Sequence, residues 1–159
     1  MALAGISSVG VKFGYAVETE AGVQPTVFNL LTRINQIGGI SIDTESIDAS
    51  ALEDEIEKMI AGRGSTGGTF DVTVNLTDDT VAEWQALITA YKAAKAAGKG
   101  VWFQTWFPNL ENGFFVVAEP PTIIPQPEVD QNGLVTTAMK LTINDYKGML
   151  KKIDMAAAA

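Results

Sequence analysis

The segment Thr69–Thr77 alternates between apolar and polar residues, and this pattern constrains the fold more than any other feature of the chain. Side chains of a strand point alternately to opposite faces, so the spacing predicts a β-strand with one buried and one solvated face. The polar face consists of Thr69, Asp71, Thr73 and Asn75, and the apolar face of Phe70, Val72, Val74 and Leu76. A strand of this kind needs neighbours, so the rest of the chain must supply a sheet.

Six further segments have the alternation, or the β-branched and aromatic content, that favours strands. Two Asn-Gly steps, at Asn112 and Asn132, favour tight turns before the last two of them. The predicted strands are Val11–Val17, Thr26–Arg33, Ile37–Glu45, Val101–Phe107, Gly113–Val117 and Leu134–Asn144.

One long helix is predicted over residues 80–97. Asp79 is the expected N-cap, and Gly98 stands where a helix-terminating glycine belongs. The buried stripe repeats at three- and four-residue spacing and consists of Val81, Trp84, Leu87, Ile88 and Tyr91. The chain therefore predicts a mainly β (α+β) fold, a β-sandwich or half-barrel with one flanking α-helix, as a single domain over residues 1–159.

The region between the predicted strands Ile37–Glu45 and Thr69–Thr77 lacks the alternation of a strand. Ala51–Ile60 is predicted to form two or three helical turns, with Ser50 and Glu53 as a capping box. A glycine-rich stretch follows, so we expect a long loop over about 46–68 that does not fold before assembly. We also expect a loose C-terminal tail over about 149–159.

Composition excludes many kinds of chemistry. The 159 residues include no cysteine and no histidine, so thiolate nucleophiles, Ser-His-Asp triads and Cys/His zinc sites are impossible. The net charge of −8 is the wrong sign for gripping nucleic acid. No stretch is long and apolar enough to span a membrane, and the N-terminus does not read as a signal peptide. We expect no enzyme activity, no cofactor and no metal site.

An aromatic concentration lies across the predicted 101–117 hairpin. It comprises Trp102, Phe103, Trp106, Phe107, Phe114 and Phe115. Aromatic platforms that stack bases come with a positively charged groove, whereas the nearby charges here include Glu111 and Glu119. Packing in the core and at a subunit interface is the preferred interpretation.

Residues 37–76 resemble the major tail tube proteins of long-tailed, siphophage-type bacteriophages. The similar stretches are the Ile37–Asp54 segment with its Ile-Asp-x-Ser/Thr pattern, Met59-Ile-Ala-Gly-Arg-Gly, and Gly67-Gly followed by the Thr- and Asn-rich strand. The helix, the aromatic strand and the final Thr-rich strand extend a weaker resemblance over about 8–148.

The resemblance implies a structural subunit of a phage tail tube. Such subunits form stacked hexameric rings whose strands join into a barrel around a lumen, the conduit for DNA ejection. The implied partners are other copies of the chain and the tape measure, terminator and distal tail proteins, while genomic DNA passes without specific binding and no membrane is involved. The implied location is the virion tail, assembled in the cytoplasm of the bacterial host.

Two sets of site residues follow. We expect the polar strand faces to line the lumen through Asp43, Glu45, Asp71, Thr73 and Asn75, although a one-residue slip would reverse the face. We expect the long loop to contact a neighbouring subunit or ring through Leu52, Ile56, Met59, Ile60 and Arg63.

Two other functions compete with this one. A tube subunit of a tailocin or gene-transfer agent has the same physical role, and the sequence does not separate it from a phage protein. A monomeric ligand- or carbohydrate-binding β-sandwich would use the aromatic hairpin as a platform. It would stay monomeric, with Trp102 or Trp106 fluorescence responding to a ligand, whereas a tube subunit would self-associate.

Overall fold

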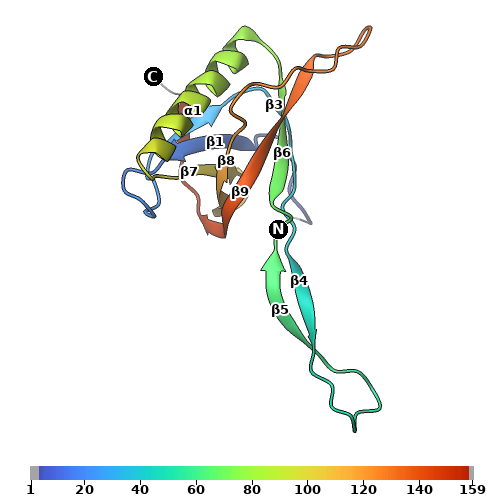
Figure 1. Cartoon of the computed structure of the whole chain (residues 1–159). Coiled ribbons are helices and arrows are strands. Elements are labelled where there is room, and N and C mark those ends of the chain that lie inside the picture. Colours follow the sequence, from blue (N-terminus) through green and yellow to red (C-terminus); the bar gives the residue numbers. More distant parts are fainter. Residues whose placement is uncertain (1–3, 158–159) are drawn as a thin grey trace.

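The computed structural model describes residues 4–157, as one body of strands with a single helix and a long projecting hairpin (Figure 1). Along the chain the described elements are β1 (Lys12–Val17), β2 (Phe28–Leu31), β3 (Ile34–Ile37), β4 (Asp43–Asp48), β5 (Met59–Ser65), β6 (Thr69–Asn75), α1 (Asp78–Ala96), β7 (Val101–Trp106), β8 (Asn112–Glu119), β9 (Thr136–Lys151) and β10 (Met155–Ala157).

Eight of the strands form one sheet in the order β10-β2-β1-β7-β8-β9-β6-β3. The 16-residue β9 pairs with β6 through its first half and with β8 through its second. The β8–β9 ladder shifts register twice, between Phe115 and Val116 and between Val117 and Ala118. Bulges bend a strand and increase its twist, so the sheet curls around the helix. The predicted mainly β, half-barrel fold with one flanking helix is confirmed.

The core lies between the concave face of the sheet and α1. Trp84 and Leu87 of the helix are fully buried against Phe103, Val72 and Leu141 of the sheet. The predicted stripe is confirmed at Trp84, Leu87, Ile88 and Tyr91, whereas Val81 is only half-buried. The alternation predicted for 69–75 is likewise confirmed, because Phe70, Val72 and Val74 are buried in this core.

The helix begins two residues earlier than expected, and its N-cap is Thr77 instead of Asp79. The Thr77 hydroxyl accepts a hydrogen bond from the Thr80 amide at 3.2 Å, and the Thr80 hydroxyl accepts one from the Thr77 amide at 2.9 Å. A threonine at the third helical position thus takes the part that glutamate usually plays in a capping box. Asp79 instead places its charge in the first turn, near the positive end of the helix dipole.

Thr77→Ala removes this cap and should destabilise the domain by about 1 kcal/mol. The measurement is the midpoint of urea unfolding. Thr89→Ala is the matched control, because Thr89 is an exposed residue in the helix interior and alanine is the better helix former. An unchanged midpoint in Thr77→Ala would show that the cap does not stabilise the folded domain.

The C-terminal residues are not a loose tail. β9 extends to Lys151, and β10 pairs in parallel with β2. Ile153, which precedes β10, and Met155, its first residue, cover the face of the sheet opposite the helix, where a second core holds Ala16, Phe28, Trp102 and Phe115. The expectation for 149–157 is therefore wrong; Ala158 and Ala159 lie outside the described residues.

Three local predictions are corrected near the turns. The expected strand Thr26–Arg33 is shortened to β2, because Arg33 adopts a positive φ of 56° and turns the chain before β3 begins at Ile34. The expected half-buried strand Ile37–Glu45 is also wrong, since residues 38–42 are irregular and β4 is exposed throughout. Asn112 starts β8 without a turn conformation, whereas Asn132 has the positive φ, 63°, of a turn.

Candidate functional site

The most prominent feature of the surface is a two-stranded antiparallel hairpin, β4–β5, which we call the arm (residues 43–65). It forms a separate sheet that projects well clear of the body (Figure 1). Its pairs run from Asp43 with Ser65 to Asp48 with Met59, with one irregularity between Thr44 and Ser46. The arm extends from the end of the sheet where β3 and β6 lie (Figure 1). Between β3 and the arm, the Gly38 amide donates a hydrogen bond to the Asp71 carbonyl of β6 at 2.7 Å.

The expected helix over Ala51–Ile60 does not form, and the expected long loop is confined to a turn at 49–58 between the two strands. An isolated helix this short is unstable in water without a surface to cover its apolar side. The arm offers none, so the backbone pairs across the hairpin. Ser50 does not cap a helix; its hydroxyl accepts from the Lys58 amide at 2.7 Å.

One carboxylate organises the tip of the arm. Asp54 accepts a hydrogen bond from the Ala51 amide at 2.8 Å and forms an ion pair with Lys58 at 3.1 Å. The Ala51 amide first, and Lys58 second, lower the pKa of Asp54. These contacts close the tip while leaving its apolar side chains outside.

Asp54→Asn should open the tip of the arm, because it removes the charge that both partners bind. A lowered carboxyl pKa means that the stabilisation is present above the usual pKa of aspartate and is lost as pH falls through the lowered value. We therefore expect the Ala51 amide to exchange faster in the variant at pH 7, and in the native chain under strongly acidic conditions. Glu55→Gln is the control, since no contact of Glu55 holds the tip. Equal exchange in Asp54→Asn and the native chain would exclude this role.

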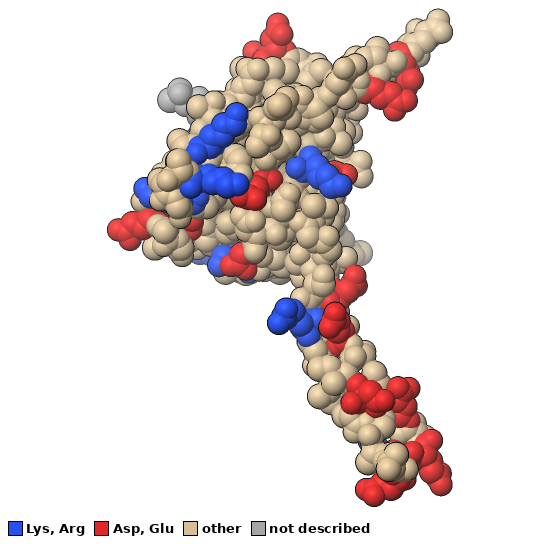
Figure 2. All heavy atoms as spheres, in the orientation of Figure 1, with Lys and Arg blue, Asp and Glu red and all other residues tan. Residues whose placement is uncertain are grey.

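The arm combines exposed apolar side chains with negative charge. The predicted contact residues Leu52, Ile56, Met59 and Ile60 are all exposed, and Ile47 joins them by pairing with Ile60 across the hairpin. The arm holds seven of the 19 acidic residues and two of the 11 basic ones, Lys58 and Arg63, a net −5 within a chain of −8. Figure 2 shows the acidic side chains gathered along it. Apolar residues left in water on a projecting hairpin indicate a surface for a partner.

The polar face of β6 is the second candidate surface. Asp71 is exposed and Thr73 and Asn75 are half-buried, all facing away from the helix-side core. Register places Lys140 of β9 directly opposite Asp71. This part of the face therefore pairs one acidic with one basic residue, a balance that the strand alone did not reveal.

The structure does not bring all five expected lumen residues together. Asp43 and Glu45 lie on β4 of the arm, whereas Asp71, Thr73 and Asn75 lie on β6 of the body. All of the β4 side chains are exposed, on both faces of the hairpin. That these residues line one channel stays a prediction.

The aromatic hairpin divides into buried and marginal side chains. Phe103, Phe115 and Trp102 are buried in the two cores. Trp106, Phe107 and Phe114 are half-buried near the end of the hairpin, where Phe107 packs edge-on against Phe114 with ring centroids 5.8 Å apart. Sequence reasoning missed that two lysines flank Trp106, because they lie 94 and 46 residues from it along the chain. No pattern in the sequence near either lysine indicates its contact with Trp106.

Within residues 4–157 no group of three or more histidine, cysteine, aspartate and glutamate residues is arranged to hold a metal ion. Among the described residues no helix is long and apolar enough to cross a membrane.

These features define a β-rich α+β fold, a curled sheet with one covering helix and a projecting hairpin. Comparison by sequence finds no matching family model and no matching curated protein. Comparison by structure finds a chain from the tail of an empty GTA particle with C6 symmetry, at a TM-score of 0.56 and 13% identity, covering 93% of this chain and 99% of that one. A chain from the virion of a native gene transfer agent (GTA) particle matches with the same values.

A third similar chain comes from the six-fold symmetrised baseplate of the anti-feeding prophage (AFP). Its TM-score is 0.55 at 10% identity, and the match covers 95% of this chain and 98% of the other. The chain therefore shares, over nearly its full length, the fold of proteins in phage-like tail particles.

Proposed function

We propose that this chain is a structural subunit of a tail tube in a phage or phage-like particle and that it works by self-assembly. The observation that carries the proposal is the projecting arm (Figure 1), whose five large apolar side chains are exposed in the described chain. The fold likeness to chains of tail particles supports the same role.

We further propose that the subunits form stacked hexameric rings. One similar chain comes from a tail with C6 symmetry, which gives the proposed ring size. Among residues 4–157, β3 pairs with β6 alone and so presents one unpaired edge, which suits strand pairing with a neighbour. The polar face of β6 and β9 would then line the lumen, where water satisfies the side chains of Asp71, Thr73 and Asn75.

In such a conduit, genomic DNA would pass without specific binding. The chain is acidic overall, and Asp71 and Lys140 balance each other on the proposed lumen face, so no positive surface would hold the phosphate backbone. The tape measure, terminator and distal tail proteins would be the other partners, within a virion tail assembled in the host cytoplasm.

Negative-stain electron microscopy across a concentration series, with sedimentation velocity on the same samples, tests this proposal. We expect hollow rings or tubes at high concentration. A chain that remains monomeric at every concentration, including in the presence of preformed tail ends as initiators, would contradict it. A tube subunit of a tailocin or gene-transfer agent is the nearest alternative, and the GTA comparisons favour it as much as a phage.

A further inference from the structure

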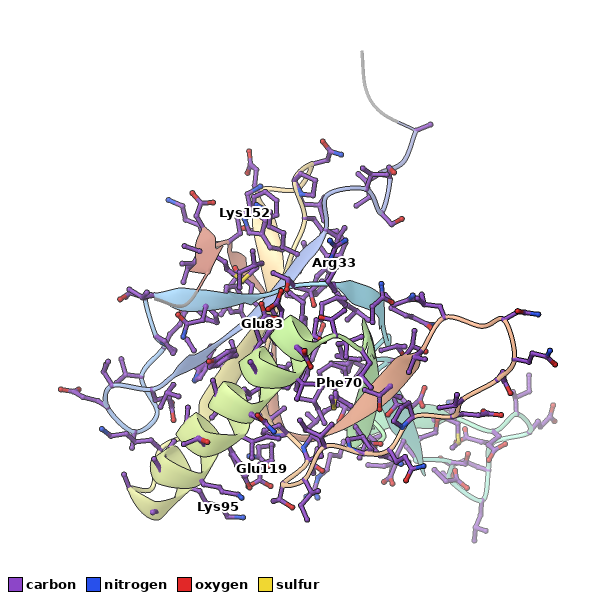
Figure 3. The ribbon with its side chains drawn as sticks, turned by 90° about the horizontal axis from the view of Figure 1, so that it is seen from above. Arg33, Phe70, Glu83, Lys95, Glu119 and Lys152 are labelled. Atoms are coloured by element: carbon purple, nitrogen blue, oxygen red, sulfur yellow. The ribbon has the colours of Figure 1, made fainter. Side chains whose placement is uncertain are left out.

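The second Asn-Gly step of the chain, Asn132-Gly133, lies in a long loop between β8 and β9, residues 120–135. Figure 1 shows this loop projecting from the other end of the body than the arm. Figure 3 shows the chain leaving the body after Glu119 and returning to β9. The proposed function makes no use of this step, and its chemistry follows from the surroundings of the two residues.

The base of this loop is anchored to the body, whereas its tip is exposed. The Thr137 hydroxyl donates to the Pro125 carbonyl at 3.2 Å, and Ile124 packs against the helix-side core. Beyond these contacts, every residue of 126–134 except Pro127 is exposed. Loop tips open at little cost in free energy, whereas core strands open at a cost close to that of global unfolding. The tip can therefore change its backbone angles without disturbing the sheet.

Asn132 and Gly133 have the freedom that a reaction between them requires. Both are exposed, and Asn132 has a φ of 63°, which asparagine adopts more readily than most residues. A Cβ added at Gly133 would find the Asp130 Cβ nearest, at the ordinary contact distance of 3.6 Å. Glycine also has no side chain to shield its backbone nitrogen. Rotation of the backbone between the two residues can therefore bring that nitrogen to the side-chain carbonyl carbon of Asn132.

The other Asn-Gly step is held in the sheet. Asn112 pairs with Lys151 of β9, and Gly113 pairs with Leu150. Gly113 is buried, and a Cβ added there would lie only 3.1 Å from the Thr105 carbonyl oxygen of β7. Because β8 lies between β7 and β9, rotating its backbone would break pairing with a neighbouring strand. The same two residue types thus have opposite environments within one chain.

We propose that Asn132 is a site of spontaneous deamidation and that the sheet protects Asn112 from the same reaction. The Gly133 nitrogen loses its proton and bonds to the side-chain carbonyl carbon, Cγ, of Asn132. The bond from Cγ to Nδ2 breaks, and ammonia leaves with a proton, so that a cyclic succinimide remains. Water then opens the ring at either of its carbonyls and leaves aspartate or isoaspartate at position 132. The reaction requires no enzyme, metal or oxidant.

Deamidation changes the charge of the loop tip. Glu128 and Asp130 lie four and two residues before Asn132, so the product places a third carboxylate beside them. One negative charge is added, and the formal net charge of the chain moves from −8 to −9. Because water is the only reagent, the extent of the reaction records the age of the folded chain. The inference concerns the single chain and does not depend on its assembly.

Peptide mapping of the folded native chain tests this site. The chain is kept in mildly alkaline buffer well below its unfolding temperature and digested at intervals, and mass spectrometry measures the conversion of each asparagine. Two asparagines serve as internal controls. Asn112 also precedes a glycine but lies in the sheet, whereas Asn109 is exposed in a turn but precedes Leu110, whose side chain shields the next nitrogen. The two controls separate the effect of the strand from that of the glycine.

We expect Asn132 to convert at least tenfold faster than either control in the folded chain. In urea, Asn112 should convert as fast as Asn132, because no strand holds it, while Asn109 should stay slow. Gly133→Ala should slow the conversion of Asn132 at least tenfold; Gly133 has no positive φ and has room for a Cβ, so the variant should fold. On native gels, the aged native chain should gain a band that comigrates with Asn132→Asp.

Equal conversion of Asn112 and Asn132 in the folded chain would overturn the protection that we assign to the sheet. If Asn132 stayed intact in the folded chain while the unfolded chain converted, the exposed loop would not be a deamidation site. Conversion of Gly133→Ala at the native rate would exclude the route through the Gly133 nitrogen. None of these results bears on whether the chain forms a tube, so the two proposals fail separately.

Discussion

A chain in which residues 43–65 are replaced by a two-residue Gly-Ser linker should fold normally and fail to assemble. The linker can close the gap because Asp43 and Ser65 are cross-strand partners at the base of the arm. None of the residues 43–65 belongs to either hydrophobic core cluster, so the free energy of unfolding should change by less than about 0.5 kcal/mol. The arm deletion therefore separates folding from association.

The loss of assembly should be large. If the arm supplies at least two anchoring side chains, each contributing about 2 kcal/mol or more, the apparent dissociation constant should rise by a factor of at least about 100 to 1,000. Sedimentation velocity over a thousandfold concentration range measures it. Rings or tubes formed by the deletion variant at native concentrations would remove the arm from the assembly mechanism.

A matched control replaces residues 19–23, an exposed loop between β1 and β2, by the same linker. This loop lies outside the arm. We expect assembly at native concentrations in that variant. If neither the arm deletion nor the 19–23 variant assembled, assembly would be sensitive to loop removal in general, and the result would assign no specific role to the arm.

The strands and the helix of the body could be predicted because burial on one side imposes a period on the sequence. Thr69–Asn75 shows period two and α1 a three- to four-residue period, since each packs one face on the same core. The positions of helix and strands were predicted correctly wherever a segment packs one face on the core. The N-cap moved from Asp79 to Thr77 because both residue types cap helices, and only the contact with Thr80 separates them.

The arm could not be predicted because nothing buries it. Without a core on one side, no alternation is required along β4 and β5. The accidental four-residue spacing of Leu52, Ile56 and Ile60 then resembles an amphipathic helix. The resemblance to tail tube proteins singled out the same segment as a contact surface; Leu52 and Ile56 are exposed at its tip, and their contact with a neighbouring subunit stays a prediction.

The contact of Lys12 and Lys152 with Trp106 could not be predicted from the sequence for a different reason. Lys12, Trp106 and Lys152 come together only through the β1–β7 pairing and the return of the chain after β9. Long-range pairings of this kind leave no local pattern. The same limit hid the C-terminal segment, whose partner Gln104 lies 49 residues away.

Ending the chain after Lys152 should destabilise the domain by about 3–5 kcal/mol. Gln104 is fully buried; its side-chain amide donates to the Ile153 carbonyl and accepts from the Ile153 amide, both at 2.8 Å. Truncation leaves the oxygen and the NH₂ group of the Gln104 side chain without their hydrogen-bond partners, at a cost of about 1–3 kcal/mol. Loss of Ile153 and Met155 also uncovers apolar surface over Phe28, Trp102 and Phe115, which adds about 1.5–3 kcal/mol.

Such a loss is a large fraction of the roughly 5–15 kcal/mol by which ordinary domains are stable. Urea unfolding followed by fluorescence measures it, and the native baseline should shift to the red because the Trp102 indole gains water. Asp154→Ala is the control, since Asp154 is exposed and belongs to the same segment. The destabilisation by Met155→Ala should lie between those of the control and the truncation, because this variant keeps both Gln104 hydrogen bonds and loses only packing. If the truncated chain unfolded at the native midpoint, the second core would be incidental and the C-terminal strand would be free to leave the sheet during assembly.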